Sequence, residues 1–208
     1  MRIRGAVGRA AAAAAGSIIA ATTLAGAASA GVDGVASIVG HGGVAIEISQ
    51  VDTKIDFVPP LDGNPLSREW FHSGRIGFRV TGARAKEWHG KVTVGYQVGY
   101  PATLNGRIRL KYSTPSLGIG PVGPATPGLF FGDLLPQAGI EVEAGFGPGI
   151  QQIEVSEGEI SGESGFLQLS GLHGSCSGVL GQMNVRPYVR VVSSSGDALV
   201  VYGQTRAA

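Results

Sequence analysis

The segment Arg107-Ile108-Arg109-Leu110-Lys111-Tyr112 has a basic side chain at every second position and an apolar or aromatic one between. Further along, Ile140-Glu141-Val142-Glu143-Ala144 repeats this alternation with acidic side chains. Because successive side chains of a β-strand point to opposite faces, each segment predicts a strand with one polar and one apolar face. Residues 118–128, Gly-Ile-Gly-Pro-Val-Gly-Pro-Ala-Thr-Pro-Gly, can form neither a helix nor a central strand. The sequence therefore predicts a long antiparallel hairpin with its tip near 118–128.

The charges of the two arms predict how the hairpin pairs. A centre near Ala125 places Arg109 opposite Glu141 and Arg107 opposite Glu143. Opposite charges directly across an antiparallel ladder stabilise it by a few tenths to about 1 kcal/mol.

The length of the arms is compatible both with a membrane-spanning hairpin and with a solvent-exposed one. Each arm has about a dozen residues, roughly 40 Å at about 3.3 Å per residue, or near 30 Å when tilted. That length spans the apolar band of a transmembrane barrel, about 25 Å tall. A solvent-facing arm of a β-sandwich explains the pattern equally well. In lipid, one hairpin would leave its edge N–H and C=O groups unsatisfied, so the membrane interpretation requires several chains to close one barrel.

The rest of the chain favours short strands. The segments 44–48, 91–96 and 185–192 alternate or are rich in β-branched residues, and Ser194-Ser195-Gly196-Asp197 predicts a turn into a strand at 198–202. No part of 31–208 has a sustained helical period or an apolar run long enough for a membrane helix. With 35 Gly and 11 Pro, the composition favours strands joined by turns and predicts a β-sandwich.

Residues 1–30 have the three parts of a secretory signal peptide. Arg2, Arg4 and Arg9 precede an apolar stretch, and Ala28-Ser29-Ala30 forms a cleavage motif before Gly31. The sequence thus predicts export. Without this segment, 13 basic and 15 acidic side chains remain, a formal charge of −2.

Several other activities are disfavoured. The basic residues form no long run, so a nucleic-acid partner is not expected. The four histidines lack zinc-ligand spacing, and Gly174-Ser175-Cys176-Ser177-Gly178 lacks the downstream His of a hydrolase triad. The lone Cys176 is expected to be a small buried residue. We therefore expect no catalytic residue, cofactor or metal, and a solvated acidic cluster at Glu154, Glu157, Glu159 and Glu163.

Several motifs stand in order along the chain, and the longest is Leu61-Asp62-Gly63-Asn64-Pro65-Leu66-Ser67-Arg68-Glu69-Trp70-Phe71-His72-Ser73-Gly74-Arg75. This run resembles L-D-x-N-x-L-[ST]-R-E-W-F-H-S-G-R of the MspA family, the octameric goblet porins of the mycolic-acid outer membrane. The others are Asp52-Thr53, Gly95-Tyr96-Gln97-Val98-Gly99-Tyr100-Pro101, Tyr112-Ser113-Thr114-Pro115, Gly147-Pro148-Gly149-Ile150-Gln151, His173-Gly174, Arg186-Pro187 with Arg190, and Tyr202-Gly203.

The resemblance implies a mainly β protein with a β-sandwich rim domain at 31–104 and 147–208, after a cleaved signal peptide at 1–30. Residues 105–146 become the transmembrane stem hairpin, which contributes two strands to an oligomeric barrel of sixteen strands from eight chains. The expected lining of the pore lumen is Arg107, Arg109, Lys111, Asp133, Glu141 and Glu143. Arg68, Glu69, Trp70 and His72 are expected at a subunit interface or in the core of the rim.

The hairpin tip departs from the family. The best-known member carries a run of aspartates there. The corresponding segment of this chain, residues 117–129, is shorter by a few residues and contains no ionisable side chain. We therefore expect a weakly selective constriction lined by Ile119, Pro121, Val122 and Pro124. Asp133, or a sister subunit, is an alternative source of carboxylates.

The sequence as a whole predicts an exported outer-membrane porin for passive diffusion of small hydrophilic solutes and ions. Its partners are expected to be outer-membrane lipid and further copies in a ring, an octamer by resemblance. The alternative is a secreted, soluble β-sandwich that binds a ligand or a partner.

Overall fold

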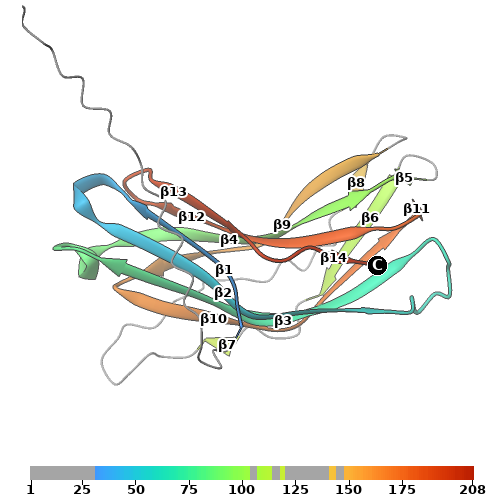
Figure 1. The fold of residues 1–208 in the computed structure, drawn as a ribbon, viewed down its shortest axis with the longest axis horizontal. Helices are drawn as coiled ribbons and strands as arrows, with labels where there is room; N and C mark the ends of the chain where they lie inside the picture. Colours follow the sequence, from blue (N-terminus) through green and yellow to red (C-terminus); the bar gives the residue numbers. More distant parts are fainter. Residues whose placement is uncertain (1–30, 104–106, 114–117, 120–140, 144–147) are drawn as a thin grey trace, which may run out of the picture.

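The computed structural model describes residues 31–103, 107–113, 118–119, 141–143 and 148–208. These residues form two packed antiparallel sheets (Figure 1). The first sheet has the order β1-β2-β3-β10-β6-β8, with β7 paired to β10, and the second has the order β13-β12-β4-β9, with β14 paired to β12. The strands predicted at 44–48, 91–96, 185–192 and 198–202 are confirmed, and so is the turn before the last of them.

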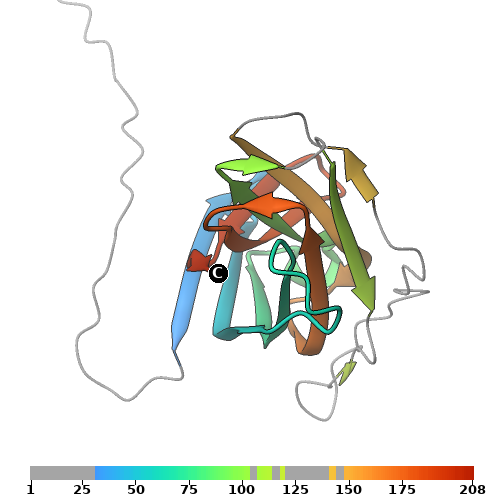
Figure 2. The ribbon, with the colours of Figure 1, turned by 90° about the vertical axis from the view of Figure 1, so that its right-hand side faces the viewer.

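The first sheet contains β1 (Val32–Val39), β2 (Ala45–Val58), β3 (Arg68–Thr81), β6 (Arg107–Ser113), β7 (Gly118–Ile119), β8 (Glu141–Glu143) and β10 (Ser164–Ser177). The second contains β4 (His89–Tyr100), β9 (Gly149–Ser161), β12 (Asn184–Ser193), β13 (Ala198–Tyr202) and β14 (Arg206–Ala207). A two-stranded sheet pairs β5 (Ala102–Thr103) with β11 (Val179–Leu180). Two 3-10 turns, η1 (His41–Gly43) and η2 (Ala85–Glu87), complete the described elements. Viewed end-on, β1 lies at one side of the sandwich and β6 and β8 at the other (Figure 2).

Alternation along the strands builds the core. In β3, Trp70, His72, Ile76, Phe78 and Val80 are buried, and most residues between them are more exposed. Two clusters result, one around Ile48, Phe78 and Trp88 and one around Trp70, Tyr96 and Met183. Trp70, expected at a subunit interface or in the core, lies in the core, and so does Trp88.

Bulges in β2 and β10 flank the same point of β3. The pairing of β2 shifts between Val51 and Lys54, and that of β10 shifts between Leu169 and Leu172. Both bulges lie beside Ser73 and Gly74. A Cβ on Gly74 would lie 3.2 Å from the Thr53 Cα, so a side chain there would press against the backbone of the bulged strand. The Ser73 hydroxyl accepts a hydrogen bond from the Gly171 N–H at 3.0 Å. The bulges thus separate the two core clusters.

Candidate functional site

The two described arms of the hairpin pair in the predicted register. Strand β6 runs antiparallel to β8, with Arg107 opposite Glu143 and Arg109 opposite Glu141. The charge pattern was therefore sufficient to predict which residues face each other across the ladder.

In the single chain, β6 also pairs along its other edge with β10. Lys111 lies opposite Ser175 and Leu110 opposite Cys176. The short strand β7 pairs with the same β10, and Ile119 lies opposite Leu167. This places the described arms of the hairpin in the first sheet, an arrangement that the sequence pattern did not predict. The other residues expected at the constriction, Pro121, Val122 and Pro124, and the lumen candidate Asp133 lie outside the described residues.

The hairpin is rooted at one end of the sandwich. Its outgoing leg follows Tyr100 through β5, and its returning leg enters β9 after Pro148. Strand β11 fixes this end because Leu180 and Val179 pair with Ala102 and Thr103. The turns at 40–44, 81–89, 162–163 and 194–197 lie at the opposite end of the sheets.

The loop 59–67 at the root end is held by the polar residues of the long motif. The Asp62 carboxylate accepts a hydrogen bond from the Asn64 N–H at 3.0 Å, and the Asn64 side chain accepts one from the Leu66 N–H at 3.0 Å. The Arg68 guanidinium donates to the carbonyls of Pro65, Ser67 and Gly181. Within this chain, Arg68 therefore joins the loop to the turn after β11.

Glu69 and His173 form a partly buried pair beside the same loop. Glu69 Oε1 lies 2.7 Å from His173 Nε2, and Glu69 Oε2 accepts a hydrogen bond from the Leu61 N–H at 3.0 Å. The ring of Phe71 stacks on His173 at a centroid distance of 4.9 Å. The sequence indicated each residue but not this contact, because the residues are far apart along the chain.

Trp70 and His72 point into the core toward the opposite sheet. Trp70 is fully buried and lies edge-on to Tyr96 at 6.0 Å between ring centroids, and His72 Nδ1 lies 2.7 Å from the Tyr96 hydroxyl. Burial lowers the pKa of His72 to about 4, although the negative charge of Asp33 opposes this change. His72 is therefore neutral near pH 7.

Cys176 is a buried structural residue, as expected. It is free, is 1% exposed and belongs to the same core cluster as Trp70. Burial raises its pKa to about 12, so the thiol stays protonated and unreactive.

Gly174 makes room for Trp70, which yields a prediction about stability. A Cβ at this position would lie 2.4 Å from the indole ring, so Gly174→Ala must displace a fully buried side chain. We expect a loss of about 1–3 kcal/mol in the free energy of unfolding, measured by denaturant titration. Gly99→Ala is the matched control, because its Cβ would meet nothing closer than 4.0 Å. Equal stability of the two variants would contradict the packing argument.

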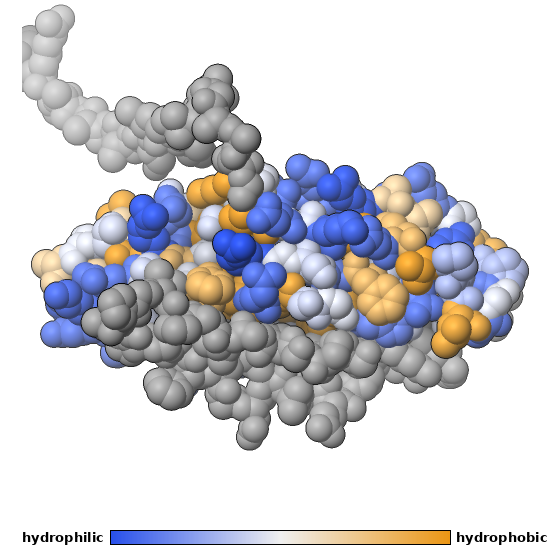
Figure 3. All heavy atoms as spheres, turned by 90° about the horizontal axis from the view of Figure 1, so that it is seen from below, coloured by the Kyte–Doolittle hydropathy of each residue, from blue (hydrophilic) through white to orange (hydrophobic). Residues whose placement is uncertain are grey.

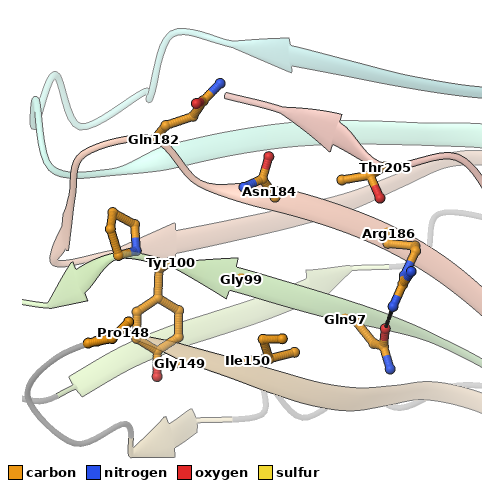
Figure 4. A pocket seen from close by; sticks show the side chains of 11 residues that line it. Gln97, Gly99, Tyr100, Pro148, Gly149, Ile150, Gln182, Asn184, Arg186 and Thr205 are labelled. Atoms are coloured by element: carbon orange, nitrogen blue, oxygen red, sulfur yellow. Dashed lines mark hydrogen bonds between the residues drawn. The ribbon is translucent and has the colours of Figure 1, made fainter.

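A groove of about 810 Å³ lies on the second sheet at the root end (Figure 4). Gly99 forms part of its lining and Ile150 borders it. The Arg186 Nε donates to the Gln97 side-chain oxygen at 3.0 Å, and the guanidinium lies 4.8 Å from the centroid of the Tyr202 ring. The groove thus combines an exposed apolar side chain with a positioned cation.

The acidic cluster is partly paired. Glu154 lies 2.8 Å from Arg190, and Glu157 forms an ion pair with Lys91. These pairs are at least one-third exposed on both sides, and such exposed pairs contribute little to stability.

The described part of the chain contains no group of three or more His, Cys, Asp or Glu side chains arranged to hold a metal ion. Over the same residues, no helix has the length and apolar character needed to cross a membrane.

The fold and the hairpin define a class: a mainly β protein in which a two-sheet sandwich carries a hairpin of alternating charged and apolar residues. The MspA family model matches residues 42–207. The chain is 37% identical over 185 residues to Porin MspB and 35% identical over 187 residues to Porin MspA, both of Mycolicibacterium smegmatis (strain ATCC 700084 / mc(2)155). These matches cover 86% of this chain and 86% of Porin MspB, and 88% of this chain and 89% of Porin MspA. The chain belongs to the MspA family.

Proposed function

We propose that this protein is a subunit of an outer-membrane porin that provides a water-filled path for small hydrophilic solutes and ions. The observation that carries the proposal is the hairpin of β6 and β8, in whose register Arg107 and Arg109 lie opposite glutamates and Ile108 lies opposite Val142. Membership of a family whose relatives are named porins supports the same function. A diffusion pore needs no catalytic residue.

The pore is assembled from several copies. One hairpin cannot satisfy its edge backbone groups in lipid, whereas a closed ring of hairpins can. In this proposal the hairpin leaves β10 and extends from its root, and its neighbours replace β10 as hydrogen-bonding partners. The lumen is lined by Arg107, Arg109, Lys111, Glu141, Glu143 and Asp133. The ring is an octamer with sixteen strands, and residues 1–30 direct its export.

Ion selectivity is weak in this proposal because the tip residues 117–129 contain no carboxylate. Purified mature protein in a planar bilayer is expected to give stepwise, long-lived openings with a small reversal potential under a salt gradient. Val122→Asp adds one carboxylate per subunit at the tip and is expected to shift the reversal potential toward cation selectivity. Strong cation selectivity of the unaltered protein would instead place control of the passage at Asp133 or Glu141.

A soluble, ligand-binding β-sandwich is the second candidate. The observation that favours it is the pairing of β6 with β10, because the described arms belong to a sheet of the sandwich in the single chain. The same bilayer measurement separates the two candidates. A folded oligomer that never conducts would contradict a homomeric porin and leave a sister subunit or the soluble binder.

A further inference from the structure

We propose that the root end of the sandwich is a membrane-contacting surface in which Leu61, Ile150 and Leu180 insert among the lipid headgroups and upper acyl chains. This root surface rests on the proposed porin function, because that function places the bilayer at the end from which the hairpin extends. It adds a second membrane contact outside the hairpin itself.

The first step is the unusual exposure of these residues. Leu61 is 96% exposed, Ile150 is 73% exposed and Leu180 is 37% exposed. They come from three separate segments at the end of the sheets where the hairpin joins the sandwich. The loop 59–67 contacts β11 through a hydrogen bond from the Val179 N–H to the Leu66 carbonyl, β11 pairs with β5, and β9 begins opposite Tyr100. Scattered exposed apolar side chains need no explanation, so the inference rests on the position of these three at the end from which the hairpin extends. In Figure 3, hydrophobic residues reach the surface at the right-hand end, interspersed with hydrophilic ones as they are along the rest of the visible face.

The second step is that Leu61 is held outward. Its own N–H donates to Glu69 Oε2, and Glu69 is in turn fixed by His173. The following residues are tied by Asp62, Asn64 and Arg68, so the loop is stabilised by its own polar side chains. A loop built in this way presents its leucine to the surroundings at little further cost in conformational entropy.

The third step is the distribution of charge. At the root end the carboxylates of Asp62 and Glu69 are engaged within the loop, whereas Arg186 and Arg206 lie in exposed positions. Exposed apolar side chains beside cations suit a lipid interface, where the cations meet phosphate. The opposite end carries Arg84, Lys86, Glu87 and the His41–Asp197 pair, a mixed and strongly hydrophilic set.

Val39 provides a matched control for these residues. It is 74% exposed, nearly the same as Ile150, but it lies opposite Ala45 at the far end of the sandwich. If the root surface contacts lipid, a probe at position 150 must meet lipid and a probe at position 39 must not, although both residues are equally accessible in the single chain.

The experiment uses three single-tryptophan additions, Leu61→Trp, Ile150→Trp and Val39→Trp, in the full mature chain inserted into phosphatidylcholine vesicles. Native Trp70 and Trp88 are buried and provide a constant background that the unaltered protein measures. Phosphatidylcholine with bromine near the top of its acyl chains is expected to quench most of the added emission at positions 61 and 150 and none at position 39. Equal quenching at all three positions, or none at 61 and 150, would overturn the root surface.

Conductance of the same preparations separates this proposal from the porin function. Normal channels without quenching at 61 and 150 would refute the root surface alone, whereas absent channels would refute the function as well. Burial of these residues against a neighbouring copy would shift the emission to the blue without bromine quenching, and would also overturn the proposal. As a second measurement, Leu61→Asp is expected to weaken vesicle partitioning of the mature chain about tenfold, since one buried leucine has roughly that effect, while Val39→Asp leaves it unchanged.

Discussion

Leu110→Asp is expected to abolish assembly of the pore in the membrane. Leu110 lies between Arg109 and Lys111, so a barrel that keeps the basic residues in its lumen turns Leu110 toward lipid. An ionised side chain at such a position costs on the order of 2 kcal/mol when it lies near the bilayer midplane. A ring repeats this cost in every subunit, and the loss of insertion is therefore far larger than for a single chain. The measurement is the fraction of membrane-inserted oligomer, together with the number of channel openings.

Lys111→Asp is the matched control, because it introduces the same carboxylate one residue away on the opposite face of the strand. We expect it to assemble normally and to change only the charge of the lumen. Val142→Asp should behave like Leu110→Asp, since Val142 alternates with Glu141 and Glu143. If Leu110→Asp inserts and conducts as well as Lys111→Asp, the hairpin does not face lipid, and the soluble sandwich becomes the better explanation.

Alternation and charge were sufficient to predict four strands of the sandwich, at 44–48, 91–96, 185–192 and 198–202, and the pairing within the hairpin. The reason is that both depend on local pattern: the period of two determines the faces of a strand, and opposite charges determine the register once the tip is located. The pairing of Arg107 with Glu143 is the clearest instance.

Other features depend on contacts between distant segments and have no local signal. The pairing of β6 with β10, the contact of Glu69 with His173 and the link from Arg68 to Gly181 each join residues that the sequence lists far apart. The bulges beside Gly74 could not be predicted from the sequence either, because a residue inserted into a strand looks like any other residue of that strand. The motif around Arg68 and Glu69 indicated a role for both residues at an interface or in the core. Only the fold showed that both residues hold the loop 59–67 in place.

The buried His72 is expected to make the sandwich acid-sensitive. Its pKa is about 4 in the folded protein and near 6.5 when unfolded, so between these values the unfolded chain binds the proton first. The contribution of His72 to stability is complete above pH 6.5, decreases as the pH falls, and is fully lost below about pH 4. The difference between the two pKa values corresponds to a loss of about 3 kcal/mol in the free energy of unfolding. Denaturant titrations at pH 7 and pH 4 measure the change, and the emission of Trp70 reports it from the same core.

His72→Gln isolates this effect from the other groups that titrate in acid. Glutamine keeps a polar side chain near the Tyr96 hydroxyl but has no proton to gain, so the variant is expected to lose about 3 kcal/mol less than the unaltered protein between pH 7 and pH 4. The variant starts from lower stability because the side chains differ in shape, and the comparison therefore concerns the slope with pH. His89→Gln, which replaces an exposed histidine outside the core, is the control substitution. Parallel slopes for His72→Gln and the unaltered protein would mean that water reaches His72 and that it titrates in the folded state as it does in the unfolded chain.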